Sequence, residues 1–228
     1  MQRAYDQIVH DVCINDLPVI FAIDRAGLVG NDGETHQGIL DLSYMSSIPG
    51  MTVFAPKNKY EFMDAIDFAA AYDHPISIRY PRGVAYTGLK EYRTPIKLGK
   101  GEVLRKGSEI ALLAVGTMVQ TAAEVADWLE KEGYHATLIN MRFIQPWDKE
   151  CVDQLNGSHR LVVTMEENVL SGGFGEKISS YISTKNYPMQ TLMIGISDQF
   201  VEHGTISELK RTLGIDTEGI ISKIKNIL

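Results

Sequence analysis

Apolar and polar residues alternate along the chain in a regular succession of helical and extended periods. Apolar residues recur at helical spacing from Met1 to Asn15, and a compact apolar run, Pro18 to Ile23, then predicts a strand. The same patterns predict strands at 51–55 and 76–80 and helices at 39–45 and 59–72. Alternating strands and helices are typical of a parallel sheet covered by helices, so this part of the chain predicts an α/β unit.

A second series of the same kind follows residue 107. It predicts strands at 110–115, 135–141, 161–165 and 190–196, and helices at 119–133, 148–155, 174–182, 206–213 and 216–228. Residues 83–107 contain Pro95, five glycines and many charges without a sustained period, which indicates a linker region. We therefore expect an α/β protein with two domains and mainly parallel sheets, divided as 1–88, a linker at 89–107, and 108–228.

Composition narrows the class of protein. The 228 residues are 44% hydrophobic and 22% charged, which suits one large or two small globular domains. The net charge of -7 argues against a nucleic-acid partner. No apolar run approaches the ~20 residues that span a bilayer, and no charged-then-apolar leader is present. Cys13 and Cys151 lie apart in apolar patterns, as expected of reduced core residues in a cytoplasmic protein with no membrane partner.

The segment from Phe21 to Gly38, FAIDRAGLVGNDGETHQG, is the first candidate for a site. Arg25 follows the predicted strand closely, and Asp32 and His36 lie four residues apart in the glycine-rich segment behind it. Open α/β sheets bind ligands at the carboxyl ends of their strands. Other interpretations stay open: Asp32 can bond its own backbone in an Asn-Asp-Gly turn, a lone loop histidine is usually solvated, and Asp24–Arg25 can be a surface ion pair.

Two further patterns carry candidate chemistry. Arg79 and Arg82 flank Pro81 at the end of another predicted strand, which suits an anionic group better than a purely solvated surface. Gly172-Gly173-Phe174-Gly175 lacks the spacing of a phosphate-binding loop and favours close helix–strand packing. Glu166 and Glu167 are adjacent on a strand, so they point to opposite faces and do not predict an acid–base pair. No Cys/His set has metal-ligand spacing.

Six segments, in chain order, resemble those of one family. They are QRAYDQIVHDV, DRAGLVGNDGETHQG, RYPRG, MRFIQP, EENVLSGGFGE and FVEHG. The chain resembles the later part of 1-deoxy-D-xylulose-5-phosphate synthase, a transketolase-like thiamine diphosphate enzyme. The resemblance implies part of a pyrimidine-binding domain followed by a transketolase C-terminal domain. It also implies condensation of pyruvate with glyceraldehyde 3-phosphate with loss of CO2, for isoprenoid, thiamine and pyridoxal precursors, in a homodimer.

The resemblance also implies roles for five residues. Arg3 matches an arginine near the thiamine diphosphate, Arg25 and Arg82 match the pair that binds the acceptor's phosphate, and Asp32 and His36 match catalytic residues near the reacting carbon. The sequence departs from the family at Ser197 and at Gln145-Pro146-Trp147.

The family's Mg2+ and diphosphate motif, GDG followed by asparagine, is absent, so we expect no metal site in this chain. The first helix begins within its period without a cap, and we expect a truncated beginning. The chain is then an enzyme part that is inactive alone. The alternatives are a non-catalytic module for oligomerisation or regulation, and one subunit of a split transketolase-like enzyme.

Overall fold

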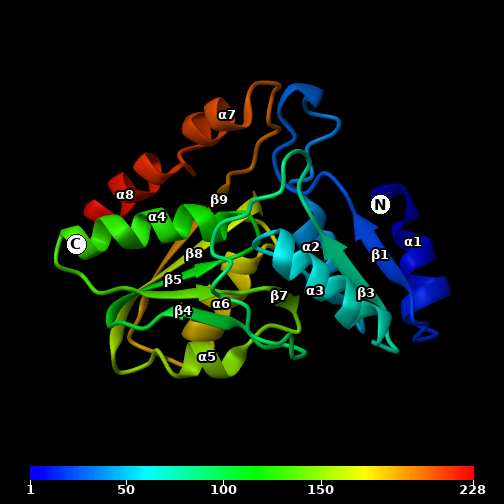
Figure 1. Ribbon diagram of the computed structural model, residues 1–228, viewed down its shortest axis with the longest axis horizontal. Coiled ribbons are helices and arrows are strands. Elements are labelled where there is room, and N and C mark those ends of the chain that lie inside the picture. Colours follow the sequence, from blue (N-terminus) through cyan, green and yellow to red (C-terminus); the bar gives the residue numbers. More distant parts are fainter.

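Two separate sheets, each covered by helices, form the molecule (Figure 1). The computed structural model describes all residues, 1–228. One sheet has four strands in the order β1-β3-β2-β7, and the other has five in the order β4-β6-β5-β8-β9. All pairings are parallel except β2 with β7 and β4 with β6. The predicted fold class, α/β with two mainly parallel sheets, is confirmed.

The first sheet is built mostly from the first third of the chain. Its strands are β1 (Ile20–Ile23), β2 (Thr52–Phe54), β3 (Ile76–Arg79) and β7 (Phe143–Gln145). Around it lie a continuous helical segment over 2–13, which includes α1 (Tyr5–Gln7), and the helices α2 (Asp41–Met45) and α3 (Lys59–Ala70). The Asn58 side chain caps α3 by accepting from the backbone N–H of Glu61.

The second sheet has helices on both faces, with α4, α7 and α8 on one side and α5 and α6 on the other (Figure 1). Its strands are β4 (Glu102–Arg105), β5 (Glu109–Ala114), β6 (Thr137–Asn140), β8 (His159–Val169) and β9 (Gln190–Ile196). Its helices are α4 (Met118–Lys131), α5 (Lys149–Asp153), α6 (Phe174–Thr184), α7 (Ile206–Leu213) and α8 (Thr217–Lys225). None of the helices is both long and apolar enough to cross a bilayer.

Two strands were not predicted from the local pattern. β4 lies inside the predicted linker, and its sequence Glu-Val-Leu-Arg is only half apolar because it forms an edge of the second sheet. β7 is three residues long and comes from the second half of the chain, yet it pairs with β2 in the first sheet. Phe54 lies opposite Phe143 in that pairing, and their rings meet edge to face at 4.8 Å. The two halves are therefore joined by a strand as well as by the linker region.

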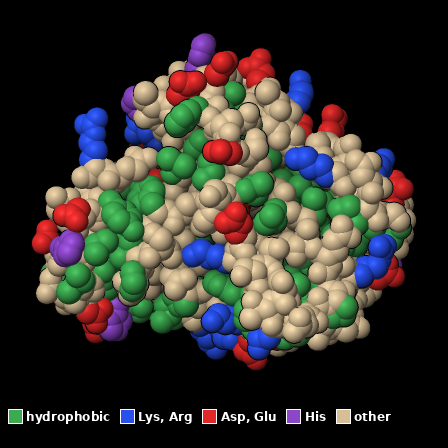
Figure 2. Space-filling view, turned by 180° about the vertical axis from the view of Figure 1, so that it is seen from behind, with side chains coloured by type: hydrophobic (Ala, Val, Ile, Leu, Met, Phe, Trp, Pro, Cys, Tyr) green, Lys and Arg blue, Asp and Glu red, His purple; other side chains and the backbone are tan.

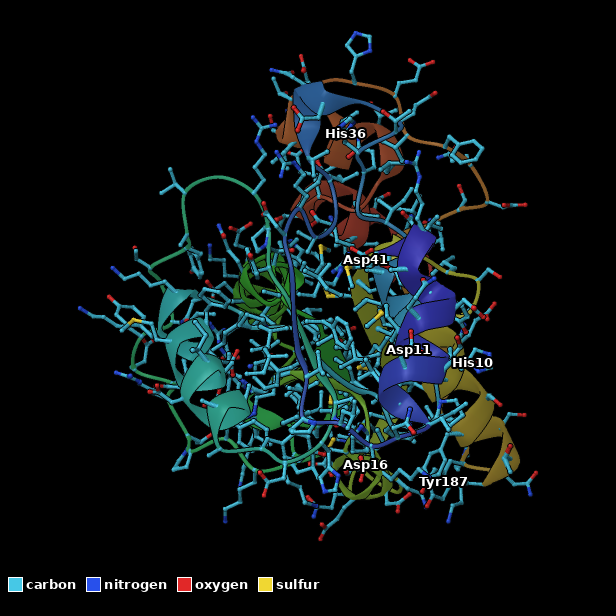
Figure 3. All side chains as sticks on the ribbon, turned by 90° about the vertical axis from the view of Figure 1, so that its right-hand side faces the viewer. His10, Asp11, Asp16, His36, Asp41 and Tyr187 are labelled. Atoms are coloured by element: carbon cyan, nitrogen blue, oxygen red, sulfur yellow. The ribbon has the colours of Figure 1, made fainter.

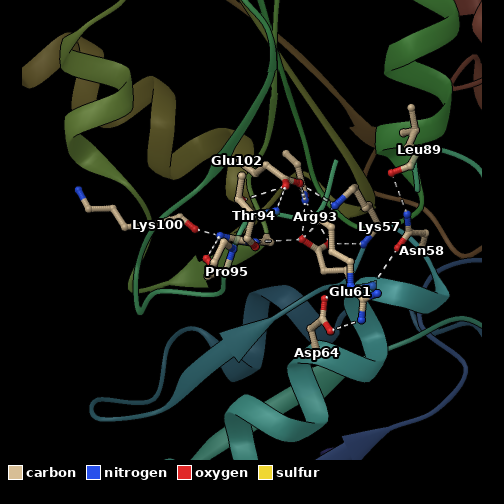
Figure 4. A network of polar contacts seen from close by, with 12 residues as sticks. Lys57, Asn58, Glu61, Asp64, Leu89, Arg93, Thr94, Pro95, Lys100 and Glu102 are labelled. Carbon is tan, nitrogen blue, oxygen red and sulfur yellow. Dashed lines mark hydrogen bonds and ion pairs between the residues drawn. The ribbon is translucent and has the colours of Figure 1, made fainter. Parts of the chain in front are cut away.

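Buried charges lie where the two halves meet, in a group that we call the junction cluster: Lys57, Glu61, Glu102, Asn140 and Arg142 (Figure 4). The Lys57 side chain is 1% exposed, and its Nζ lies 2.6 Å from Glu102 and 3.3 Å from Glu61. Arg142 and Asn140 also approach Glu61. Lysine and arginine together offset the two carboxylates, so α3 is bound to β4, β6 and the turn after β6 by paired charges.

Apolar side chains are exposed along the outer edge of the first sheet. Ile14, Leu17 and Ile20 are all more than two-fifths exposed. Figure 2 shows hydrophobic side chains gathered over this side of the molecule, on the left of the view. β1 pairs only with β3, so its other side offers unpaired backbone groups. An apolar, unpaired strand edge favours association with another strand.

We expect the chain to self-associate through this edge, and Ile20→Lys to weaken the association because a lysine on an edge strand opposes pairing. Sedimentation velocity over a concentration series measures the effect. Val103→Lys is the matched control, since Val103 is 43% exposed on the edge strand β4 and Ile20 is 45% exposed on β1. A wild-type chain that stays monomeric at every concentration, or an equal effect of the control, contradicts the prediction.

Lys57→Met is expected to lower the free energy of unfolding by about 3–5 kcal/mol, because it leaves Glu61 and Glu102 buried with too little positive charge. Urea unfolding measures the change. Lys100→Met is the control, because Lys100 is 45% exposed and its nearer partner, Glu150, is 67% exposed. Similar losses for the two variants would show that burial does not decide the strength of these pairs.

Candidate functional site

The loop that follows β1, residues 24–38, is closed at its base by backbone hydrogen bonds. We call it the β1 loop. Gly27 and Gly38 donate to each other's carbonyl oxygens at 2.9 and 2.8 Å, and Ala26 donates to Tyr80 O at the end of β3. A Cβ atom on Gly38 would lie 2.0 Å from the carbonyl oxygen of Arg25, so the close approach requires glycine. Gly27 and Gly38 thus fix the base of the loop.

Arg25, Asp32 and Arg82 come together beside this base. Arg25 Nε lies 3.5 Å from Asp32 Oδ2, and Arg82 Nη1 forms an ion pair with Asp32 Oδ1. Hydrogen bonds from Arg82 and Arg25 hold the pKa of the Asp32 carboxyl below its usual range. The arginine side chains remain 45% and 48% exposed. One anion, the Asp32 carboxylate, therefore reaches both guanidinium groups.

The alternative interpretations of this segment are now decided in part. Asp24 does pair with Arg25, at 3.0 Å between Oδ2 and Nη1. Gly30–Asp32 forms a single helical turn that ends at Gly33 with a positive φ of 75°. The Asp32 carboxylate does not serve that turn, because its partners are the two arginines. Arg25 itself adopts a left-handed φ of 64°, which is unusual for a residue with a side chain.

His36 and Arg3 lie apart from the Asp32 pairs. His36 is exposed and its Nδ1 lies 2.9 Å from the Thr35 hydroxyl. Figure 3 shows it in the β1 loop, with Asp41 below it and nearer the N-terminal helix. Arg3 is exposed on the helical segment 2–13 and makes no side-chain hydrogen bond or ion pair. The structure thus groups three of the five predicted site residues and leaves two outside that group.

Two cavities open beside the β1 loop. The larger, about 780 Å³, is lined among others by Arg25, His36 and Asp41. The smaller, about 390 Å³, is lined among others by Arg82, Lys59 and Thr117. Asp24 lines both, so it stands between them. His36 therefore shares a cavity with one of the two arginines, while Arg3 lines neither.

Arg79 does not belong to this exposed group, and its pairing with Arg82 around an anion was predicted wrongly. Its side chain is 5% exposed and donates to the carbonyl oxygens of Gly38 and Glu167. Alternating directions along β3 send it inward. The only signal for this role in the sequence is the position of Arg79 on the strand itself.

The glycine-rich run and the two glutamates serve packing at the second sheet. Phe174 and Gly175 N–H groups donate to the Glu166 carboxylate at 2.9 and 2.8 Å, and burial raises the pKa of Glu166 to about 7. A Cβ on Gly173 would lie 2.7 Å from both Glu166 oxygens. Glu167 instead pairs with Lys210 at 2.9 Å. The glutamates face different neighbours, as predicted, and Gly173 permits close helix–strand packing.

The residues of this chain do not by themselves form a complete site for thiamine diphosphate with its pyrimidine ring and its magnesium-bound diphosphate. No group of three or more His, Cys, Asp or Glu side chains is placed to hold a metal ion. Magnesium at a diphosphate is held through one or two protein carboxylates together with the phosphate oxygens and water. Arg25 and Arg82 can bind a phosphate group, whereas the Arg3 side chain makes no hydrogen bond or ion pair. What this chain itself offers a ligand is the pair of half-exposed arginines, Arg25 and Arg82.

Two family descriptions match the chain. "Transketolase, pyrimidine binding domain" matches residues 1–86, and "Transketolase, C-terminal domain" matches residues 99–220. Among curated relatives, the 1-deoxy-D-xylulose-5-phosphate synthase of Lachnoclostridium phytofermentans is 54% identical over 225 residues, which is 98% of this chain and 36% of the relative. That of Clostridium tetani is 41% identical over 228 residues, 100% of this chain and 37% of the relative. The chain spans little more than a third of these relatives.

Solved structures share the fold. A protein described as "Split gene transketolase, inactive beta4 tetramer" has a TM-score of 0.86 and 29% identity, covering 98% of this chain and 71% of that chain. Transketolase from Campylobacter jejuni has a TM-score of 0.72 and 21% identity, covering 91% of this chain and 31% of that chain. The domain matches and these relatives lead to one conclusion. The chain belongs to the transketolase family and is similar to the C-terminal part of 1-deoxy-D-xylulose-5-phosphate synthases.

Proposed function

We propose that this chain is the acceptor-binding and C-terminal part of a thiamine diphosphate-dependent 1-deoxy-D-xylulose-5-phosphate synthase. The complete enzyme condenses pyruvate with glyceraldehyde 3-phosphate and releases CO2. In this proposal residues 1–88 are part of the pyrimidine-binding domain, 89–107 the linker and 108–228 the C-terminal domain. The Mg2+ and diphosphate site lies on polypeptide outside this chain, and the working form is a homodimer.

One observation carries the proposal: Arg25 and Arg82 converge on a single anion. Both contact the Asp32 carboxylate, Arg25 from the β1 loop and Arg82 from the turn after β3. A phosphate group is a larger anion that accepts bidentate hydrogen bonds from guanidinium groups. Because the arginine side chains remain about half exposed, an incoming phosphate can reach both. We therefore assign the phosphate of glyceraldehyde 3-phosphate to this pair.

Within this proposal the other residues have separate roles. His36 moves or stabilises a proton near the reacting carbon, because each nitrogen of an imidazole can donate or accept a proton. Asp32 is a catalytic residue in this proposal and acts as an ionised group, because hydrogen bonds from Arg82 and Arg25 lower the pKa of its carboxyl. Arg3 contacts thiamine diphosphate, which when bound supplies the carbanion chemistry of the family.

A second candidate is one subunit of a split transketolase-like enzyme. The structure described as a split gene transketolase favours it, because the matched region takes in 98% of this chain and 71% of that chain. A role limited to oligomerisation is the third candidate. Adding a separately produced upstream domain to the chain and assaying product distinguishes an enzyme part from a module that never gains activity.

We expect the purified chain alone to form no deoxyxylulose phosphate, because the family's motif for Mg2+ and diphosphate is absent from its sequence. The assay supplies thiamine diphosphate, Mg2+, pyruvate and glyceraldehyde 3-phosphate, with a full-length synthase as positive control. Turnover by the chain alone would contradict this prediction.

In a complete enzyme carrying this sequence, Arg82→Ala is expected to raise the KM for glyceraldehyde 3-phosphate about ten- to a hundredfold, through loss of charge-assisted hydrogen bonds. Pyruvate carries no phosphate, so its KM is expected to stay unchanged. Steady-state kinetics with each substrate varied in turn measures both constants. Equal shifts of the two KM values would show that Arg82 does not bind the phosphate.

His36→Ala in the same enzyme is expected to lower kcat more than it changes either KM. A group that acts on a proton as the reaction proceeds contributes mainly to the transition state. The kcat values are compared with those of Thr35→Ala, which removes the hydroxyl beside His36 but keeps the imidazole. An unchanged kcat for His36→Ala would remove this residue from the catalytic group.

A further inference from the structure

The β1 loop is packed into the second half of the molecule, although it belongs to the first sheet. Leu28 and Ile39 are buried in the same apolar core as Ile194 of β9 and Leu209 of α7. Ile39 O accepts a hydrogen bond from Val169 N–H at the end of β8. The loop that carries Arg25, Asp32 and His36 thus has its apolar anchors in the C-terminal domain.

Arg79 joins the base of this loop to β8. Its Nη2 donates to Gly38 O at 2.6 Å and to Glu167 O at 2.8 Å. Gly38 is also the residue whose backbone pairs with Gly27 at the loop base. Asp41 Oδ2 lies 3.6 Å from Arg79 Nε, which has no hydrogen-bond partner, and balances the buried charge. One buried guanidinium therefore holds together β3, the loop base and β8.

Gln37 and Glu167 complete the attachment. Gln37 Oε1 accepts from Val29 N–H at 2.7 Å within the loop, and its Nε2 donates to Glu202 O at 3.1 Å before α7. Glu167 accepts from the Thr117 hydroxyl and pairs with Lys210. A Cβ atom on Gly27 would lie only 2.2 Å from Oε2 of Glu167. The loop backbone therefore rests directly on side chains of the C-terminal domain.

We propose that Arg79 and Gln37 are positioning residues that make the anion-binding geometry of Arg25 depend on the C-terminal domain. The inference rests on the proposed function of Arg25 and Arg82 in binding phosphate. Arg25 lies two residues before Gly27 and has a left-handed backbone conformation. The direction of its side chain therefore depends on the backbone hydrogen bonds that hold the loop base in place. If the base loosens, Arg25 and Arg82 no longer converge on one anion. A lysine at position 79 keeps the charge but loses the fork that donates to two carbonyl oxygens.

Two measurements on the full chain test the proposal: amide hydrogen exchange at Gly27, Val29 and Gly38, and titration with inorganic phosphate. Arg79→Lys is expected to speed exchange at Gly27 and Gly38 and to weaken phosphate binding, each by about tenfold. Gln37→Ala is expected to speed exchange at Val29, whose amide loses its acceptor, and to weaken phosphate binding by a smaller factor than Arg79→Lys does. The milder Gln37→Ala keeps the test available where Arg79→Lys fails to fold.

The matched control is Arg142→Lys. Arg142 is as buried as Arg79 and also donates to backbone carbonyl oxygens, those of Lys100, Thr94 and Pro95. It is expected to lower the unfolding temperature without changing exchange in the β1 loop or phosphate binding. An equal effect of Arg142→Lys on the loop would show general loosening and overturn the proposal.

The outcomes separate this proposal from the proposed function. Unchanged loop exchange in Arg79→Lys overturns the positioning role whatever happens to phosphate. Faster exchange with unchanged phosphate binding also overturns it, provided that Arg25→Ala and Arg82→Ala weaken binding in the wild-type background. If those two alanine variants bind phosphate as the wild type does, the proposed phosphate site is wrong, and with it the role of Arg79 toward Arg25.

Discussion

The buried charges between α3 and the second sheet are the constraint on which the arrangement of the two halves depends. Lys57 and Arg142 face Glu61 and Glu102, and all four side chains are at most 3% exposed. Buried ion pairs add little net stability compared with apolar packing, but a mispaired alternative leaves a charge unpaired in a low-dielectric interior. The cluster therefore favours one relative placement of the sheets over others. β7 enforces the same placement through its pairing with β2.

This placement brings the carboxyl ends of β1 and β3 up to the carboxyl end of β8. Only then can Arg79, at the end of β3, reach the carbonyl oxygen of Glu167. Only then do Leu28 and Ile39 find a core in the second half of the chain. Ligand sites of open α/β sheets lie at strand ends because the loops there rest on a rigid sheet. In this protein the rigid support comes from a second sheet as well as from the sheet that carries the loop.

The sequence predicted the local elements well where one period dominated. β9 has the predicted bounds, and side-chain caps from Asp148 and Thr205 stand where the pattern predicts helices to begin. It failed for β4 and β7, whose identity as strands depends on partners far along the chain. For the site, motif resemblance and strand ends located Arg25 and Arg82. The pairing of Asp32 with Arg82 could not be predicted from spacing, because these residues lie fifty positions apart.

Burial separates the arginines of this molecule into two kinds. Arg79 and Arg142 are buried, and each donates to more than one backbone carbonyl oxygen. A guanidinium suits this task because it remains charged and presents five donors in a fixed plane. Arg25 and Arg82 are half exposed and pair with carboxylates instead. A buried N–H group that already donates to a carbonyl oxygen cannot bind a ligand, so only the half-exposed arginines can bind an incoming anion. The buried arginines instead fix the backbone that holds the half-exposed ones.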